Sequence, residues 1–105
     1  KLSKEREDIL RVSAIIQARI SSIWIKPNSL SESLVAKVLI NLAPSGEILN
    51  FDLIEPSINT SFNNSILTAM NRMTFFEEVL SLDRKLFEQN FRNFNLAFKS
   101  SGEIE

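Results

Sequence analysis

The chain contains no cysteine and no histidine. Without cysteine it can form no disulfide, no thiolate nucleophile and no cysteine zinc site, and cysteine pairing says nothing about its compartment. Without histidine it lacks the commonest general base near neutral pH and the commonest metal ligand, which excludes Ser-His and Cys-His catalysis. An enzyme built from this chain would therefore have to use carboxylates alone.

An excess of charge of one sign is also missing. The chain has 12 basic and 13 acidic residues, which are interspersed and leave a net charge of -1. This balance provides no basic field, so we expect no nucleic-acid partner. No apolar run approaches the roughly 20 residues of a spanning helix, and the chain opens on Lys1 without a signal-like apolar region. With 105 residues, 44% of them hydrophobic, we expect a single soluble domain over residues 1–105, excised from a longer protein.

Residues 1–26 are predicted to form an amphipathic N-terminal helix. Apolar residues recur at spacings of three and four, while charged residues occupy other faces. The apolar series is Ile9, Val12, Ile16, Ile20 and Ile23. Pro27 should end the helix, because the residue before a proline avoids helical geometry. A polar link over residues 28–32 follows.

A β-hairpin is predicted over residues 33–55. Apolar residues alternate up to Leu42, stop at Ala43-Pro44-Ser45-Gly46 and resume at Ile48. Pro44 presets the geometry of a type I turn and Gly46 can adopt the left-handed conformation that follows, so we expect a three-residue loop with Ala43 opposite Glu47.

The second strand of this hairpin has its apolar residues out of phase with the first. With Ala43 opposite Glu47, Val38 and Ile40 would face polar residues, whereas Phe51 and Leu53 form the apolar set of the second strand. We therefore predict one extra, bulged residue within 48–50, which would bring Phe51 and Leu53 to the face of Ile40 and Val38. Glu55-Pro56 should then end the strand.

The rest of the chain is predicted to be a helical segment over residues 61–91, a third strand over residues 92–99 and a frayed tail over residues 100–105. Asn59, Thr60 and Ser61 are candidate N-caps for a helix over 62–72, and Ser81 is the expected cap of a further helix ending near Asn90. Asn93, Asn95 and Ala97 alternate with apolar residues, which is typical of a half-buried strand.

The predicted fold class is α+β, with helices packed on one face of a three-stranded antiparallel sheet. The third strand follows a helical excursion, so an all-antiparallel sheet requires it to lie beside the first strand. The spatial order becomes second, first, third, or 2-1-3. A polar set faces water on the uncovered side, namely Lys37, Asn41, Asn50, Asp52, Asn93 and Asn95.

The order of these elements resembles the C-terminal periplasmic domain of TolA, within the TonB/TolA C-terminal superfamily. The resemblance covers most of the chain. It rests on Ile16, Gln17, Ile20 and Trp24 before Pro27, on the run 38–46, on Ser57 with Phe62 and Asn63, and on Leu86-Phe87 leading through Phe91-Arg92 to the run 94–98. The Tyr-Pro pair that TonB proteins usually place before their hairpin is missing, which favours the TolA branch.

The resemblance implies a protein-binding domain and no enzyme. TolA-like proteins are anchored in the inner membrane by a separate N-terminal helix, and their periplasmic C-terminal domain engages the TolB N-terminal segment. Pal, colicins and filamentous phage coat protein are further implied partners of the Tol-Pal system, which supports outer-membrane integrity and cell division. We expect the isolated domain to be monomeric and to need no cofactor.

The edge of the third strand is the predicted partner-binding site. The second strand carries the expected bulge, Asp52 and Glu55-Pro56, which blunt an edge, whereas residues 93–98 contain neither proline nor charge. A partner segment should add there as an extra strand. The predicted site residues are Arg92, Asn93, Phe94, Asn95, Leu96, Ala97, Phe98 and Lys99. Arg92 and Lys99 flank the strand and are expected to attract an acidic segment.

Two alternatives stay open at this point. A TonB-like energy transducer would dock outer-membrane receptor peptides on the same edge. A carboxylate enzyme needs two converging acids or a metal cluster, and the adjacent pair Glu77-Glu78 is not at such a spacing. We therefore expect neither catalytic nor metal-binding residues.

Overall fold

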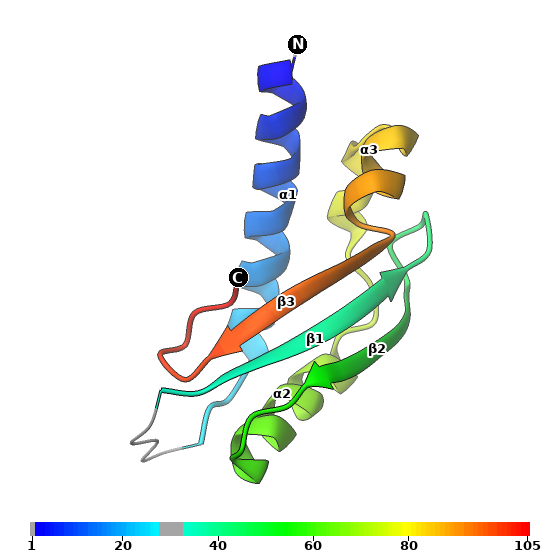
Figure 1. Cartoon of the computed structure of the whole chain (residues 1–105). Coiled ribbons are helices and arrows are strands. Elements are labelled where there is room, and N and C mark those ends of the chain that lie inside the picture. Colours follow the sequence, from blue (N-terminus) through cyan, green and yellow to red (C-terminus); the bar gives the residue numbers. More distant parts are fainter. Residues whose placement is uncertain (1, 28–32) are drawn as a thin grey trace.

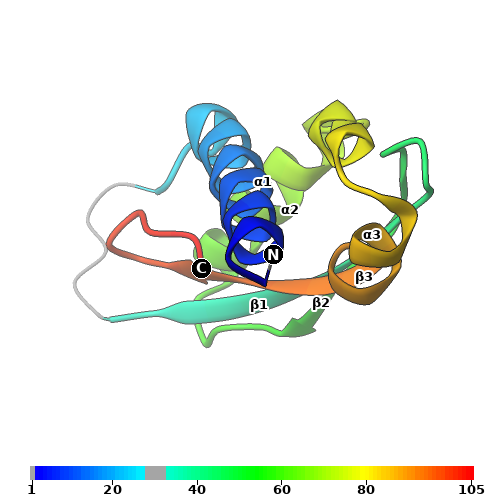
Figure 2. The same ribbon diagram turned by 90° about the horizontal axis from the view of Figure 1, so that it is seen from above.

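The sheet and the helices form two layers in the computed structural model, which describes residues 2–27 and 33–105; the predicted polar link over 28–32 lies outside the described residues (Figure 1). The elements are α1 (Leu2–Ile23), β1 (Val35–Leu42), β2 (Ile48–Glu55), α2 (Thr60–Arg72), the 3-10 helix η1 (Glu77–Ser81), α3 (Arg84–Asn90) and β3 (Asn93–Lys99). The strands pair antiparallel in the order β2-β1-β3, and the view along the sheet shows α1 and α2 on one face (Figure 2). The predicted α+β architecture and strand order are confirmed.

Helix α1 ends at Ile23, before the predicted boundary at residue 26. Trp24 still donates its backbone N–H to the carbonyl of Ile20 at 3.0 Å, but its side chain turns into the core. There the indole ring meets Phe62 and Phe98 edge-on, with centroids 5.8 and 5.2 Å away, and its Nε1 donates to Ser65 Oγ at 3.0 Å. Burying this ring, with its one donor satisfied, stabilises the junction of α1, α2 and β3.

The alternation of β1 gives the sheet its two different faces. The inward side chains of β1 are completely buried, namely Ala36, Val38, Ile40 and Leu42. They contact the apolar stripe of α1, in which Val12, Ile16 and Ile20 are also buried. The outward side chains of β1 are exposed or half-buried, as the alternation predicts, but only Lys37 and Asn41 are polar, whereas Val35 and Leu39 are apolar.

The hairpin has the predicted turn and the predicted bulge. Ala43 donates its N–H to the carbonyl of Glu47 at 2.9 Å, and Gly46 has a φ of 93°. Leu42 pairs with Ile48 and Asn41 with Asn50, so Leu49 is the extra residue.

Beyond the bulge, the strand has the predicted phase. Phe51 lies opposite Ile40 and Leu53 opposite Val38. A second irregularity, which the sequence did not predict, leaves Ile54 without a partner between Leu53 and Glu55. β2 ends at Glu55, as expected before Pro56.

The predicted helical segment over 61–91 is divided into α2, η1 and α3. Asn59 caps α2 by accepting the N–H of Phe62 at 2.9 Å. The cap of α3 is Asp83, which accepts the N–H of Leu86 at 2.9 Å, so the prediction of Ser81 is wrong. Ser81 instead ends η1, and Asp83 is the polar residue at the correct spacing before Leu86.

Between α2 and η1, an extended segment pairs with the turn end of the hairpin. Ile48 donates its N–H to the carbonyl of Thr74 at 2.9 Å, and Phe76 donates to the carbonyl of Gly46 at 2.8 Å. These bonds place the Gly46 backbone directly against Phe76, where a side chain would not fit. The turn is therefore held both by its own residues and by a distant segment.

The prediction of a frayed tail is wrong. Gly102, with a φ of 103°, reverses the chain after β3, so that Ile104 lies opposite Phe98 and is only 7% exposed. Lys99 donates its N–H to the carbonyl of Glu103, and Glu105 donates to the carbonyl of Ala97, each at 2.9 Å. Residues 103–105, which we name the tail strand, run back along the outer side of β3.

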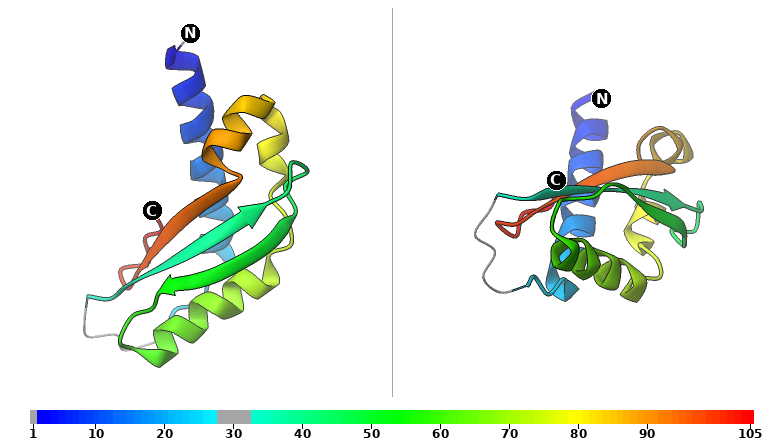
Figure 3. Two further views of the ribbon diagram at one scale, coloured as in Figure 1. Left: turned by 45° about the vertical axis from the view of Figure 1, so that its right-hand side comes forward. Right: turned by 60° about the horizontal axis from the view of Figure 1, so that its bottom comes forward.

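The domain is elongated, with extents of 45 × 26 × 21 Å. α1 crosses the covered face of the sheet, and its N-terminal part extends beyond the sheet, while α2 runs beside β2 (Figure 3). The core lies between these helices and the sheet. Trp24 and Phe98 are buried there, whereas Phe51 and Phe94 are only half-buried and pack at its margin.

Candidate functional site

The sheet has two edges, and they differ in structure. The β2 edge is interrupted by the irregularities at Leu49 and Ile54, and the carbonyl of Thr74 already accepts a hydrogen bond at its start. Bulges of this kind twist an edge away from further pairing. This edge is therefore less regular than the edge of β3.

The β3 edge is regular. β3 pairs with β1 without a register shift from Asn93 opposite Asn41 to Lys99 opposite Val35. In an antiparallel pair the backbone groups of alternate residues point to opposite sides. The carbonyl of Arg92 accepts the N–H of Leu42, so it points towards β1. The N–H and C=O groups of Asn93, Asn95 and Ala97 therefore point outward, away from the sheet.

The tail strand closes one end of this edge. It uses the Lys99 N–H and the Ala97 carbonyl, both of which a partner strand would need. Within the part of the chain that the structure describes, the outward groups that form no backbone hydrogen bond are the N–H and C=O of Asn93 and Asn95 and the N–H of Ala97. The open edge therefore extends from Asn93 to Ala97, and it excludes Phe98 and Lys99 of the predicted site.

The predicted site residues divide between the two faces of β3. Asn95 is exposed on the outer face, where the side chain of Asn93 contacts that of Asn41. Leu96 and Phe98 are buried on the inner face, at 5% and 0% exposure. Phe98 is thus core, in agreement with an alternating aromatic stripe that packs inward.

The two cations that flank β3 already have acidic partners. Arg92 Nη1 lies 3.2 Å from Glu88 Oε2, and Lys99 Nζ lies 3.0 Å from Glu105 Oε1. The hydrogen bond to Glu105, together with the charge of that carboxylate, raises the pKa of Lys99 above 10.5. These surface pairings offset part of the positive charge that is expected to attract an acidic segment.

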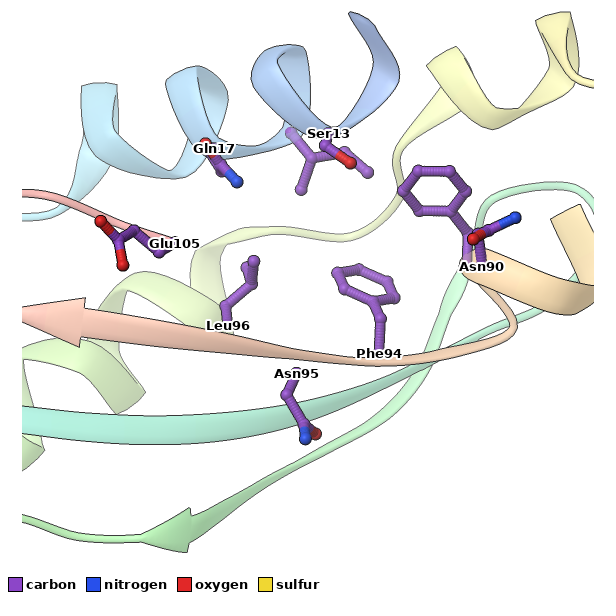
Figure 4. Close-up of a pocket in the computed structure, with 9 residues that line it drawn as sticks. Ser13, Gln17, Asn90, Phe94, Asn95, Leu96 and Glu105 are labelled. Atoms are coloured by element: carbon purple, nitrogen blue, oxygen red, sulfur yellow. The ribbon is translucent and has the colours of Figure 1, made fainter. Parts of the chain in front are cut away.

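A pocket of about 140 Å³ opens on the inner side of the β3 edge (Figure 4). Phe94 and Leu96 point into it from β3, and Ser13 and Gln17 face it from α1, whereas Asn95 points to the other side of the sheet. Phe91 stands edge-on to Phe94, with ring centroids 5.7 Å apart. The pocket has apolar walls and a neutral polar rim, with Glu105 at one end.

Sequence reasoning missed the tail strand and the contribution of α1. The only signal for the tail strand is the alternation Glu103-Ile104-Glu105 after Gly102, which is too short to indicate a strand. Ser13 and Gln17 lie four residues apart on α1 and therefore share a face. Nothing in their spacing indicates that this face borders the sheet edge.

Comparison with known proteins identifies the family. A family model described as TonB C terminal matches residues 11–81, which is more than half of the chain. The chain belongs to the TonB C-terminal family. A search of curated proteins found no match.

A solved structure is also similar to this TonB C-terminal domain. The solution NMR structure of TolAIII bound to a peptide derived from the N-terminus of TolB is similar to it, with a TM-score of 0.69 and 27% sequence identity. The match covers 78% of this chain and 66% of the TolAIII chain, so the domain spans just under two thirds of that neighbour. The predicted membership of the TonB/TolA superfamily is confirmed.

The family match ends at Ser81, so α3, β3 and the tail strand of this TonB C-terminal domain lie outside it. Across residues 2–27 and 33–105, no helix is long and apolar enough to cross a membrane. The same residues contain no group of three or more acidic side chains arranged to hold a metal ion.

Proposed function

We propose that this TonB C-terminal domain is a TolA-like docking domain that binds an extended segment of TolB by adding it as a strand to β3. The regular, partly open edge from Asn93 to Ala97 carries this proposal, because a partner strand needs outward N–H and C=O groups in one register. The similarity to TolAIII, a protein solved with a TolB peptide bound, supports it.

The wider role follows from the same proposal. The domain would lie in the periplasm, belong to a protein anchored in the inner membrane, and couple that membrane to TolB and Pal at the outer membrane. It would thereby support envelope integrity and cell division in a Tol-Pal system, and colicins or filamentous phage coat protein would use the same surface. A binding domain of this kind needs no catalytic residue and no cofactor.

The number of open backbone groups on β3 limits how much the edge can contribute to binding affinity. Each backbone hydrogen bond contributes about 1 kcal/mol net, and association costs several kcal/mol. The few outward groups from Asn93 to Ala97 are therefore too few to hold a partner alone, and side-chain contacts must contribute. We expect affinity on the order of micromolar, which suits reversible coupling.

An NMR titration tests the proposal. When the labelled domain is titrated with a peptide from the TolB N-terminus, the amide signals of Asn93, Asn95 and Ala97 should shift together, since their N–H groups point at the added strand. Shifts confined to the outer face of α1 or to the β2 edge would overturn the proposal.

Asn95→Pro gives a second test on the same edge. The outward N–H of Asn95 takes no part in the pairing with β1, so proline removes a donor to the partner while leaving that pairing intact. We expect at least a tenfold loss of TolB peptide affinity with a retained fold. Asn95→Ala, which keeps the N–H, is the matched control and should lose much less affinity than Asn95→Pro.

A TonB-like domain that docks outer-membrane receptor peptides is the second candidate, because the family match itself is to the TonB C-terminal domain. The two candidates share the edge and differ in the partner. Binding of a receptor-derived peptide in preference to the TolB peptide would favour the TonB-like role.

A further inference from the structure

We propose that the pocket beside β3 selects the partner by accepting one uncharged aliphatic side chain from the docked strand. The pocket, defined here by Ser13, Gln17, Phe94 and Leu96, opens directly at the edge where the strand would add. This inference rests on the proposed function and adds to it the chemistry of the residue that is recognised.

The tail strand provides the structural template. It pairs antiparallel with β3, placing Glu103 opposite Lys99, Ile104 opposite Phe98 and Glu105 opposite Ala97. Side chains alternate between the two faces of a strand, and accordingly Ile104 is buried while its two acidic neighbours are exposed. An aliphatic side chain is therefore what the inner face already accepts at this edge.

A docked strand that continues the line of the tail strand reaches the open edge in the same register. The first partner residue beyond Glu105 would lie opposite Leu96. Like Ile104, which lies two positions earlier in the same line, its side chain would face inward. That inward position coincides with the pocket, because Leu96 and Phe94 line the pocket and Asn95 points away from it.

The size and polarity of the pocket define the side chain. A volume of about 140 Å³ is close to that of an engineered cavity that binds benzene, so the pocket is large enough for a Val, Leu or Ile side chain. Glu105 borders the pocket, but its carboxylate already pairs with Lys99 at 3.0 Å, so among the described residues the pocket offers no unpaired charge to a docked side chain. A carboxylate would also lose its hydration between Phe94 and Leu96.

Peptide variants test the inference. In an alanine scan of the TolB N-terminal peptide, one aliphatic position should stand out, with a tenfold to hundredfold loss of affinity for the labelled 105-residue chain. Aspartate at that position should abolish binding. Its methyl protons should show NOEs to the side chains of Phe94 and Gln17. A scan without such a position, or NOEs to other residues, would overturn the inference.

A pocket-filling variant supplies the matched comparison. Ser13→Leu should occupy the pocket and weaken the original peptide by about tenfold, whereas it should leave the alanine-substituted peptide almost unaffected. Ser22→Leu makes the same change on the exposed side of α1, outside the pocket, and should change neither affinity. Circular dichroism of both variants verifies that α1 is retained, and the peptide scan remains decisive if Ser13→Leu does not fold.

These measurements distinguish failure of the pocket inference from failure of the proposed function. If the TolB peptide causes no shift at Asn93, Asn95 and Ala97, the proposed function fails. If those amides shift but the peptide scan is flat and Ser13→Leu binds normally, only the pocket inference fails.

Discussion

At the scale of single residues, Gly46 is the position at which the backbone is most constrained. Its φ is 93°, and a Cβ there would lie 2.3 Å from the carbonyl oxygen of Phe76. We expect Gly46→Ala to lower the free energy of unfolding by about 2 to 4 kcal/mol, from left-handed strain plus overpacking. Urea denaturation measures this loss.

Gly102 is the matched control for that prediction. It has a similar φ of 103°, but the nearest atom to an added methyl group would be Lys26 Nζ at 3.4 Å, the end of a flexible side chain. Gly102→Ala should therefore cost only about 1 to 2 kcal/mol, the strain alone. Equal losses at the two glycines would contradict the role of Phe76.

Lys99 gives the domain a predicted alkaline pH dependence. The hydrogen bond to Glu105 and the charge of that carboxylate raise its pKa in the folded chain above 10.5. A raised pKa means that the ion pair stabilises the tail strand fully below pH 10.5 and that this contribution is lost as the pH rises through the folded pKa.

The Ile104 methyl signals report this change. They should shift above pH 10.5 in the original chain, while those of Ile66 in the core stay constant. Lys99→Met removes the titrating group, so its Ile104 signals should not respond over the same range. A response that persists in Lys99→Met would refute the assignment.

At the scale of elements, the strands and the hairpin could be predicted because their signals are local. Alternation identified β1 and β3, and the phase conflict between the two hairpin strands placed the bulge within residues 48–50, where the structure has Leu49 as the extra residue. The cap at Asp83 was missed because Ser81, another capping residue, stands nearby. The tail strand was missed because three residues carry too little periodicity. Long-range bonds, such as that from Ile48 to Thr74, have no sequence signal.

The tail strand is the element whose removal should affect binding. Deleting residues 103–105 frees the Ala97 carbonyl and the Lys99 N–H, so a longer partner strand can pair with β3. We expect roughly thirtyfold tighter binding of the TolB peptide, at about 1 kcal/mol for each of the two added bonds. The domain should lose about 1.5 to 3 kcal/mol of stability with the burial of Ile104.

Calorimetric titration and urea denaturation measure these two effects separately. Glu105→Gln is the control, because it removes the ion pair with Lys99 but retains the backbone bond to Ala97. Its peptide affinity should stay far closer to that of the original chain than to that of the deletion variant. Unchanged affinity after the deletion would mean that the tail strand does not limit the edge.

At the scale of the whole molecule, the site combines parts that are distant in sequence. The family match covers residues 11–81, whereas the candidate edge is β3 and the pocket adds α1 from the other end of the chain. The sequence could indicate which strand edge is open, since that depends on proline, charge and bulges. It could not indicate the pocket, because Ser13 and Leu96 meet only through the crossing of α1 over the sheet.

The shape of the molecule leads to a last prediction, on the N-terminal part of α1, which extends beyond the sheet (Figure 1). The side chains of residues 4–8 are exposed or half-buried, and Asp8 pairs locally with Lys4 and Arg11 at 3.8 and 3.5 Å. Such surface pairs contribute about 0 to 1 kcal/mol. Deleting residues 1–8 should therefore reduce stability by less than about 1 kcal/mol and leave TolB peptide affinity unchanged.

Ile16→Ala is the comparison, because Ile16 is 1% exposed and packs in the core. It should cost about 2 to 5 kcal/mol. Urea unfolding followed by circular dichroism measures both variants, and peptide titration measures the binding of the truncated chain. If the deletion cost as much as Ile16→Ala, the projecting turns would belong to the cooperative core. The expected small loss instead confines that core to the sheet and the part of α1 that crosses it.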